Sequence, residues 1–138
     1  MALVERYLSG AHLTIDLVLC SPARRTRETW DGIRNGLSGA PEVRFVPEVY
    51  EATAGELVDV LRQVDNHHTS VLLIGHNPGM AELADELIGD GRRKALDRLA
   101  EGFPTGALAT LTVDRAWSDL DRHTARLESY LRPRDLAD

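Results

Sequence analysis

Apolar residues recur along the chain with two different periods, and stretches of the two kinds alternate. Some stretches are short and nearly continuous or alternating in apolar residues, as strands are, at residues 13–20, 43–50, 70–75, 106–113 and 125–131. In others the apolar residues fall three or four positions apart, as on one face of a helix, at residues 3–8, 26–37, 53–64, 80–88 and 94–101. Strands that alternate with helices predict a three-layer α/β sandwich with a mostly parallel sheet.

The residues between these stretches include several that begin or end helices and strands. Thr53 and Glu56 have the spacing of a capping box before the third helix. Pro47 ends the second strand or places it at a sheet edge, because proline cannot donate a hydrogen bond to a neighbouring strand. The first helix, residues 3–8, would end at Gly10 but has no capping residue before it. We therefore expect it to be the last part of a longer helix.

Two strand-to-helix junctions share one design. The first strand runs into Ser21-Pro22, and the third runs through His76 into Asn77-Pro78. Serine and asparagine are good N-caps, and proline is favoured at the first helical position. In an open parallel sheet, ligands bind beyond the carboxyl ends of the strands, where helix N-termini present N–H groups to anions. We therefore predict that both junctions open onto the same edge of the sheet.

Arginines gather at the first junction, at the end of a helix that disfavours them. Arg24, Arg25 and Arg27 fall in the first turns, where the helix dipole disfavours each cation by about 0.3–1 kcal/mol. A bound anion would reverse that argument, and a guanidinium forks well onto phosphate oxygens. Together with His76 at the sister junction, the cluster favours a local phosphate site over a set of solvated surface arginines.

Length, charge and cysteine content limit the classes of function. The 138 residues suit one compact domain, residues 1–138. The net charge of −6 argues against a general binder of nucleic acid or anionic membranes, so an anion site must be a local pocket of positive charge. No apolar run reaches the ~20 residues that span a bilayer, and no signal-peptide pattern is seen. Since Cys20 is the only cysteine, no intrachain disulfide can form, and we expect a cytoplasmic protein.

Other residues that could carry chemistry have simpler interpretations. The sixth residue after Cys20 is Thr26 and not arginine, so the C-x5-R loop of cysteine phosphatases is absent. Neither of the glycine-rich nucleotide-binding patterns occurs. Four histidines lie in predicted loops without the spacing of a metal site: His12, His67, His68 and His123. We therefore expect no metal and no cofactor.

The two junction motifs together resemble a known family. "CSPARRTRET", followed about fifty residues later by "LLIGHNPG", is similar to the histidine phosphatase superfamily, also called phosphoglycerate-mutase-like. The resemblance is greatest to its short bacterial SixA-type phosphohistidine phosphatases. "VYEATAGELVDVLRQV" and "LRPRDL" also resemble that group, so the similarity extends from about residue 3 to residue 136. It implies the phosphoglycerate-mutase-like fold and phosphatase chemistry.

The mechanism of that family implies roles for the matching residues. A histidine in an Arg-His-Gly or Arg-His-Ala element on the first strand attacks phosphorus and becomes phosphohistidine. Its neighbouring arginine, a second arginine and a second histidine surround the phosphoryl oxygens, and by motif the latter two correspond to Arg25 and His76. Main-chain N–H groups at Ser21 and Asn77 would assist. Phosphoryl transfer depends mainly on such positioning and charge stabilisation.

This chain departs from the family at the nucleophile. No Arg-His-Gly or Arg-His-Ala element occurs, and His12 is the only histidine before the S-P motif. The uncapped helix 3–8 resembles the end of the family's first helix, so we expect the first family strand and its nucleophile to be lacking. The sheet would then expose the edges of apolar strands. Such edges recruit a second copy of the chain, giving a homo-oligomer, unless the sheet rearranges to close the gap.

Two functions from different classes remain. The first is a SixA-like phosphatase that acts on a phosphohistidine protein or a small phosphomonoester, with a nucleophile that these residues do not supply. The second is a non-catalytic phosphate-binding or interaction protein, a degenerate relative. A mutase ranks below both, because the segment between the motifs is short for the mutase insertions of the family. Glu51 is the candidate proton donor by position, and a solvated loop glutamate is the alternative reading.

Overall fold

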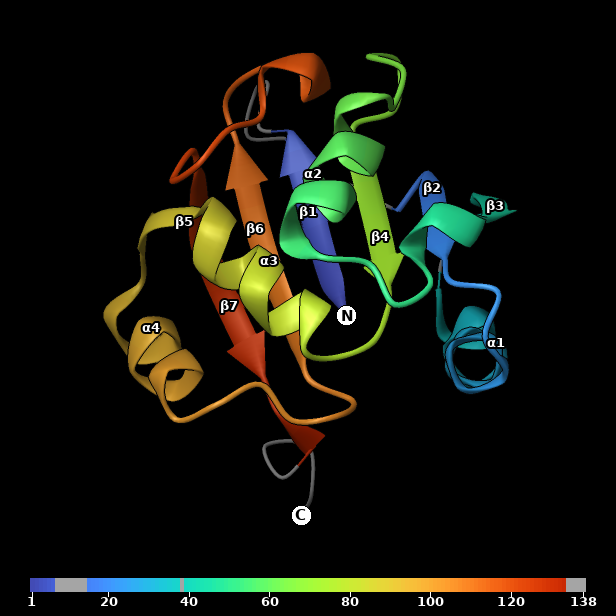
Figure 1. Cartoon of the computed structure of the whole chain (residues 1–138), viewed down its shortest axis with the longest axis horizontal. Coiled ribbons are helices and arrows are strands. Elements are labelled where there is room, and N and C mark those ends of the chain that lie inside the picture. Colours follow the sequence, from blue (N-terminus) through green and yellow to red (C-terminus); the bar gives the residue numbers. More distant parts are fainter. Residues whose placement is uncertain (7–14, 38, 134–138) are drawn as a thin grey trace.

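Seven strands form one mixed sheet in the computed structural model, which describes residues 1–6, 15–37 and 39–133 (Figure 1). Across the sheet the strands are ordered β3-β2-β4-β1-β6-β7-β5. Their bounds are β1 Ala2–Arg6, β2 Leu17–Cys20, β3 Glu42–Phe45, β4 Ser70–Ile74, β5 Ile88–Gly91, β6 Leu108–Val113 and β7 Ala125–Leu131. Four of the six strand pairs are parallel, and the β1–β4 and β6–β7 pairs are antiparallel. The sheet is therefore mostly parallel, as the alternating pattern predicts.

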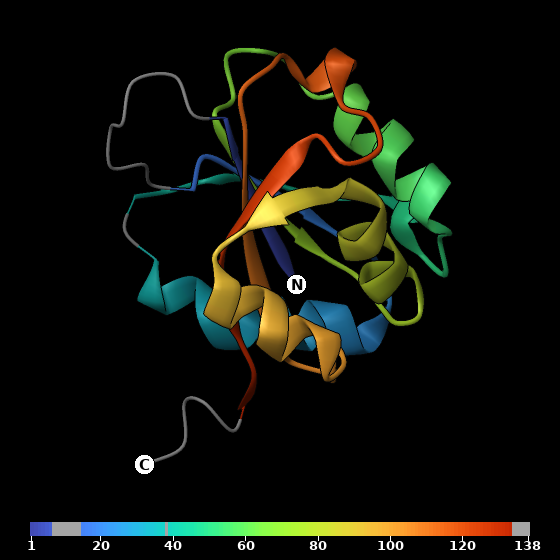
Figure 2. The ribbon, with the colours of Figure 1, turned by 90° about the vertical axis from the view of Figure 1, so that its left-hand side faces the viewer.

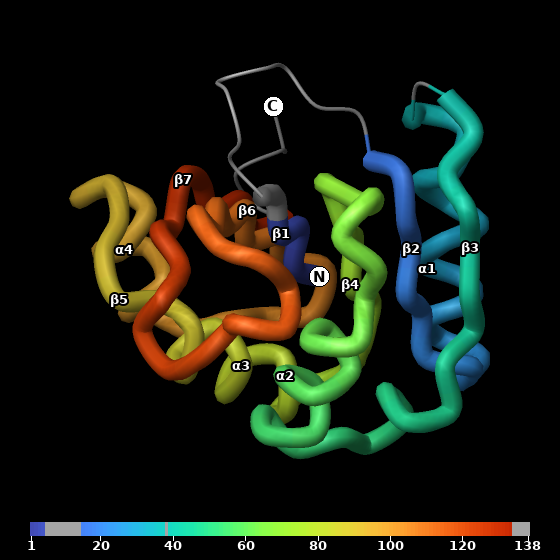
Figure 3. Tube along the Cα trace, turned by 90° about the horizontal axis from the view of Figure 1, so that it is seen from above, coloured from blue at the N-terminus to red at the C-terminus, as the bar shows by residue number. Residues whose placement is uncertain are grey.

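Helices cover both faces of the sheet. The described residues form four α-helices, α1 Arg24–Ile33, α2 Ala54–Arg62, α3 Gly79–Leu87 and α4 Arg93–Ala100. Short 3-10 helices are η1 Arg34–Gly36, η2 Pro47–Val49 and η3 Trp117–Asp119. Helices α2 and α3 lie side by side on one face, and α1 packs on the other face behind β2 and β3 (Figures 2 and 3). This is the three-layer arrangement expected from the sequence.

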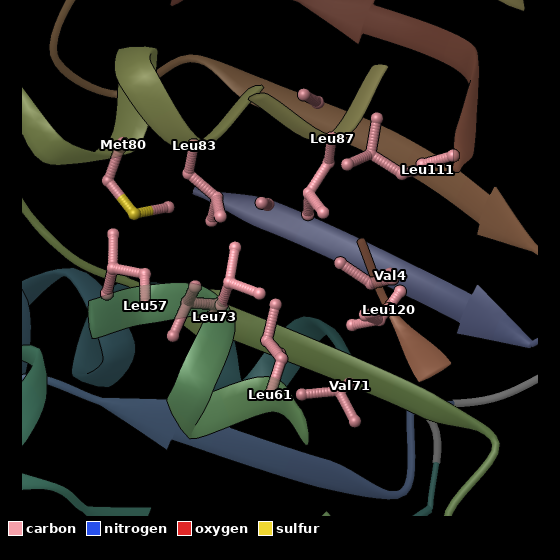
Figure 4. Close-up of a cluster of buried hydrophobic side chains, with 14 of the residues drawn as sticks. Val4, Leu57, Leu61, Val71, Leu73, Met80, Leu83, Leu87, Leu111 and Leu120 are labelled. Atoms are coloured by element: carbon pink, nitrogen blue, oxygen red, sulfur yellow. The ribbon is translucent and has the colours of Figure 1, made fainter. Parts of the chain in front are cut away.

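The larger core lies between the sheet and the α2–α3 pair. Helix α3 directs Met80, Leu83 and Leu87 toward α2 and the strands, and α2 contributes Leu57 and Leu61 (Figure 4). All five side chains are buried. The capping box predicted before α2 is present, because the Thr53 hydroxyl accepts a hydrogen bond from the Glu56 backbone and the Glu56 carboxylate accepts from the Thr53 backbone. A defined start for α2 places its apolar face on the sheet.

Most elements agree with the sequence pattern, and two do not. The short strand β5 was not expected, because Ile88–Gly91 contains two glycines and one apolar side chain. The segment predicted as the first helix, 3–8, is instead strand β1 over Ala2–Arg6, while its residues 7 and 8 lie outside the described part of the chain. Gly10, His12 and the start of the predicted strand 13–20 also lie outside it.

Tertiary pairing explains why the first segment is a strand. Three consecutive apolar residues fit a helix or a strand equally well by pattern. In the structure β1 lies between β4 and β6 and pairs with both. Ala2 and Val4 join the larger core, and Leu3 packs on the opposite face. The edge of β4 that we expected to be exposed is therefore paired, and β2 pairs on both sides as well.

A carboxylate interrupts the apolar strand pattern just before β2, and the structure gives it a partner. Asp16 Oδ2 accepts hydrogen bonds from the Thr69 backbone N–H at 2.9 Å and from the Thr69 hydroxyl at 3.2 Å. His68 Nδ1, on a buried side chain, lies 3.4 Å from Asp16 Oδ1. Asp16 thus joins the start of β2 to the start of β4.

Asp16→Ala is expected to lower the free energy of unfolding by about 1–3 kcal/mol, because it removes the acceptor of a partly buried N–H group. Urea denaturation would measure the change. Asp97→Ala, at an exposed position of α4, is the matched control and should stay within about 0.5 kcal/mol of the parent. Equal stability of the Asp16 and Asp97 variants would show that this carboxylate does not hold β2 to β4.

Candidate functional site

A pocket opens at the carboxyl end of β4, at the lower end of that strand in Figure 1. Its volume is about 130 Å³. Three parts of the chain form most of its lining: the first turns of α1, the β4–α3 junction, and the loop between α4 and β6. The lining residues are Met1, Arg25, Thr26, Thr29, Ile74, Gly75, His76, Asn77, Met80 and residues 103–106. The pocket thus contains residues of both motifs found in the sequence.

The two junctions meet because their strands are parallel neighbours. Cys20 at the end of β2 is paired with Ile74 at the end of β4. The Ser21 N–H donates to the Ile74 carbonyl at 3.0 Å, which extends that pairing by one residue. The segments that follow β2 and β4 then lead into helices α1 and α3 at the same edge of the sheet. The predicted convergence of the two junctions is therefore what the structure shows.

Arg25 is the one arginine of the cluster that lines the pocket. Its side chain is exposed, and among the described residues it makes no ion pair. Arg24 instead points to Glu28, at 3.7 Å between highly exposed side chains, a contact that contributes little. The Arg27 guanidinium lies 5.7 Å from the centroid of the Phe45 ring. Arg25 is therefore available for an anion, as the sequence argument expects.

His76 follows β4 directly and is half-buried in the pocket wall. Its carbonyl accepts a hydrogen bond from Met80 N–H at 3.0 Å, so the first turn of α3 holds its backbone. Gly79 begins α3 against the carbonyl of Ala52, where a Cβ would come within 2.2 Å. Glycine is thus required for α3 to approach the 49–52 segment closely. This packing fixes the position of the histidine relative to β4.

Ser21 and Asn77 have different placements. Ser21 is fully buried and is not among the lining residues, and its Oγ accepts from the Ala23 N–H at 3.3 Å. Helix α1 begins three residues after Ser21, and α3 begins two residues after Asn77, so neither residue is the N-cap that we predicted. Asn77 does line the pocket. Its side chain accepts from Ala81 N–H and donates to the Phe103 carbonyl.

Glu51, the candidate proton donor, is exposed and does not line the pocket. Its backbone has φ = 50°, in the left-handed region that non-glycine residues rarely adopt. It lies in the segment that leads to Ala52, beside the start of α3. The structure therefore places Glu51 near this edge of the sheet but does not bring its carboxylate into the pocket.

The lining includes one histidine, His76, among the described residues. The chain does contain an Arg-His pair, Arg122-His123, but it follows the second motif and precedes a threonine. His123 lies before β7 and lines a different pocket, with Asp90 and Asp114. Strand pairing places that pocket beyond the end of β6, at the edge of the sheet opposite to His76. This pair therefore does not supply the family's nucleophile to the site.

The loop between α4 and β6 was missed by the sequence argument. Residues 103–106 form one side of the pocket, although no motif marks them. Gly102 and Gly106 have φ values of 130° and 86°, so the loop uses conformations that favour glycine. The spacing of these glycines could have indicated an ordered turn. It could not have shown that the turn closes a pocket more than twenty residues after His76.

Three further features bear on the chemistry of the site. Cys20 is buried beside the first junction, and burial raises the pKa of its thiol, so it is a poor nucleophile. Within the described ranges, no three histidine, cysteine or acidic side chains gather as a metal ion would require. In the part of the chain that the structure describes, no helix has the length and apolar character to cross a bilayer.

Comparisons of the sequence find relatives without an assigned activity. An uncharacterized protein of Mycobacterium tuberculosis strain H37Rv is 33% identical over 122 residues, which cover 87% of this chain and 75% of that protein. An uncharacterized protein of Mycobacterium leprae is 32% identical over 136 residues, which cover 94% of this chain and 82% of that protein. No family model matches the sequence.

Comparisons of the structure find proteins of one kind. A protein from Nakamurella multipartitia, assigned as the phosphohistidine phosphatase SixA, superposes with a TM-score of 0.73 at 29% identity, over 90% of this chain and 74% of that one. A protein histidine phosphatase SixA complexed with tungstate gives a TM-score of 0.69 at 20% identity, over 98% of both chains. A further protein assigned as SixA, from Agrobacterium tumefaciens, gives 0.66 at 22% identity. The last two likenesses concern the fold alone.

Proposed function

We propose that the pocket binds the phosphoryl group of a phosphorylated substrate, because the chain is similar in structure over most of its length to SixA phosphohistidine phosphatases of the histidine phosphatase superfamily. The observation that carries the proposal is the presence of Arg25 and His76 in one pocket at the carboxyl edge of the sheet. Arg25 forks onto two phosphoryl oxygens, and His76 donates a hydrogen bond to a third. The start of α3 adds a favourable dipole.

The proposed reaction is phosphatase chemistry of the SixA type. The imidazole nitrogen of a nucleophilic histidine attacks phosphorus, and the bond from phosphorus to the substrate's leaving group breaks, so that this group departs with a proton from the proton donor. Water then attacks phosphorus, the P–N bond breaks, and phosphate and the free histidine result. Arg25 and His76 stabilise the charge on the equatorial oxygens in both steps. The nucleophile is not supplied by these residues, since the Arg-His-Gly or Arg-His-Ala element has no counterpart in them. Glu51 remains the proposed proton donor, which requires its segment to turn toward the pocket.

The size of the pocket bears on the substrate. At about 130 Å³ it is smaller than the roughly 300–1,000 Å³ of pockets that enclose whole small molecules. It therefore suits a phosphoryl group that enters while its carrier stays outside. Phosphohistidine on a protein meets this requirement, and so does a small phosphomonoester with an exposed leaving group. Phe45, the last residue of β3, and Tyr50, in the segment that follows it, are 48% and 52% exposed and offer contact surface to a carrier.

A second candidate function is phosphate binding without catalysis. The observation that favours it is the combination of an intact Arg25–His76 pair with a single histidine among the described lining residues. Such a protein would recognise a phosphorylated partner and leave the phosphoryl group in place. The two candidates share the binding step and differ only in turnover, so one set of measurements addresses both.

Calorimetric titration of the 138-residue chain with tungstate tests the proposal. We expect saturable binding at one site, weakened about tenfold or more in His76→Ala because a hydrogen bond to a charged group is lost. The same samples should hydrolyse an aryl phosphate no faster than background. Absence of binding would refute the phosphoryl site. Rapid turnover that disappears in His76→Ala would instead refute the account of the nucleophile.

A further inference from the structure

Residues 103–106, which we name the pocket wall, are held at both ends. The Tyr130 hydroxyl donates to the Gly102 carbonyl at 2.6 Å, just before the wall begins. The Ala107 N–H donates back to the Pro104 carbonyl at 3.1 Å, which closes a turn at the other end. The Phe103 ring packs 5.6 Å from the Tyr130 ring, measured between centroids. The wall is therefore an ordered turn with its own supports.

Asn77 links this wall to the motif that carries His76. Its Nδ2 donates a hydrogen bond to the Phe103 carbonyl, 26 residues away in sequence. Its Oδ1 accepts from the Ala81 N–H at 3.2 Å, in the first turn of α3. The two ends of one amide thus connect the start of α3 with the opposite side of the pocket. An aspartate at this position could cap the helix, but its ionised carboxylate has no N–H group to donate to the wall.

We propose that Asn77 is a positioning residue that holds the pocket wall against the start of α3 and thereby sets the width of the oxyanion pocket. The inference rests on the proposed function, because the width matters only if the pocket takes a phosphoryl group. The wall and the Arg25–His76 pair lie on different segments, and the Asn77 amide joins the wall to the segment that carries His76. When the wall is held close to the start of α3, the pocket admits a phosphoryl group and excludes a bulkier substituent on phosphorus.

The competing explanation is that the Asn77 side chain binds the oxyanion directly. The amide has two N–H donors, and the contact with Phe103 needs only one of them. Direct binding predicts that loss of the amide weakens every oxyanion equally. Positioning predicts a change in selectivity between small and bulky oxyanions. Positioning also predicts the same change in selectivity when the wall loses its other support, the hydrogen bond from the Tyr130 hydroxyl to the Gly102 carbonyl.

The experiment compares inorganic phosphate with phenylphosphonate in calorimetric titrations of the 138-residue chain. Asn77→Ala removes the hydrogen bond from Asn77 to the Phe103 carbonyl, so the wall is less firmly held. We expect phosphate binding to weaken about threefold to tenfold, which corresponds to the contribution of one hydrogen bond. Phenylphosphonate should be affected less, so the ratio of its Kd to that of phosphate should fall at least about threefold. Asn35→Ala, at an exposed position in η1 outside the pocket, is the matched control and should leave both affinities unchanged.

Tyr130→Phe supplies the second variant, because Tyr130 does not line the pocket and cannot bind the oxyanion. It removes the hydroxyl that holds Gly102 while it keeps the ring beside Phe103. We expect the same direction of change in the Kd ratio as in Asn77→Ala. We also expect faster amide hydrogen exchange over residues 102–107 in both variants, with or without oxyanion.

The outcomes separate the inference from the proposed function. If the parent chain binds neither oxyanion, the proposed function fails, and the role of Asn77 in the site fails with it. If the parent binds phosphate but Asn77→Ala leaves the Kd ratio unchanged, only the positioning role is overturned. Equal weakening of both ligands, with unchanged exchange over residues 102–107, would assign Asn77 to direct binding and also overturn the inference. A lower ratio in both variants supports it.

Discussion

Arg25→Ala is expected to weaken tungstate binding by about ten- to a hundredfold, while Arg24→Ala changes it by less than about twofold. The two residues are neighbours in sequence and carry the same charge, so the comparison separates contact from general electrostatics. Arg25 lines the pocket and has no ion-pair partner among the described residues. Arg24 points away toward Glu28, with its side chain 92% exposed. A charge-assisted, two-pronged contact is lost only in the first variant.

Arg25→Lys refines this test. Lysine keeps the positive charge but lacks the planar fork, so binding should recover only in part. Titrations at low and high salt would show the difference, because a general charge effect is screened by salt and a direct contact is screened much less. Similar losses in the Arg24 and Arg25 alanine variants would remove Arg25 from the site and leave the phosphate proposal resting on His76 alone.

Gly79→Ala is expected to lower the free energy of unfolding by about 3 kcal/mol or more. An added Cβ would come within 2.2 Å of the Ala52 carbonyl oxygen, which belongs to the backbone and cannot turn aside. Either α3 or the segment before α2 must shift, and overpacking of this kind costs about 1–3 kcal/mol or occasionally more. The carbonyl would also lie against a methyl group. Since α3 begins at Gly79, the same shift would displace His76 and weaken oxyanion binding.

Gly55→Ala is the matched control, because Gly55 also lies in the first turn of a helix. A Cβ at that position meets no atom within 4 Å. Alanine there should raise stability by about 0.5–1 kcal/mol through helix propensity and a less flexible unfolded chain. Thermal unfolding followed by circular dichroism would measure both variants. A Gly79 variant as stable as the Gly55 variant would contradict the close packing of α3 on the 49–52 segment.

The capping box and the convergence of the two motifs are the parts of this structure best predicted from sequence. Thr53 and Glu56 form a local signal, because both partners lie within one helical turn of each other. The meeting of the Ser21 and His76 junctions follows from a general property of parallel strands, whose carboxyl ends share an edge. Charge at an unfavourable helix end indicated the cluster of Arg24, Arg25 and Arg27, and the resemblance to the family singled out Arg25 within it.

Elements that depend on distant partners were not predicted correctly. Residues 2–6 carry an apolar pattern that does not distinguish helix from strand, and their pairing with β4 and β6 decided the outcome. Asp16 looked like an interruption of a strand, and its hydrogen bonds to Thr69, more than fifty residues away, show why it is there. The wall at residues 103–106 and its link to Asn77 depend in the same way on a contact across 26 residues.

The sequence alone was sufficient to predict the layered α/β architecture, the capping box that begins α2, and the two motifs that meet at the pocket. These features depend on neighbours in sequence or on the rule that parallel strands end at the same edge of a sheet. A pattern of residue types is enough to indicate both. Three features depend on tertiary packing: residues 2–6 form a central strand, Ser21 is buried outside the pocket lining, and Asn77 donates a hydrogen bond to the wall. These outcomes depend on which backbone groups and surfaces remain unpaired once the rest of the chain has packed, and no local pattern carries that information.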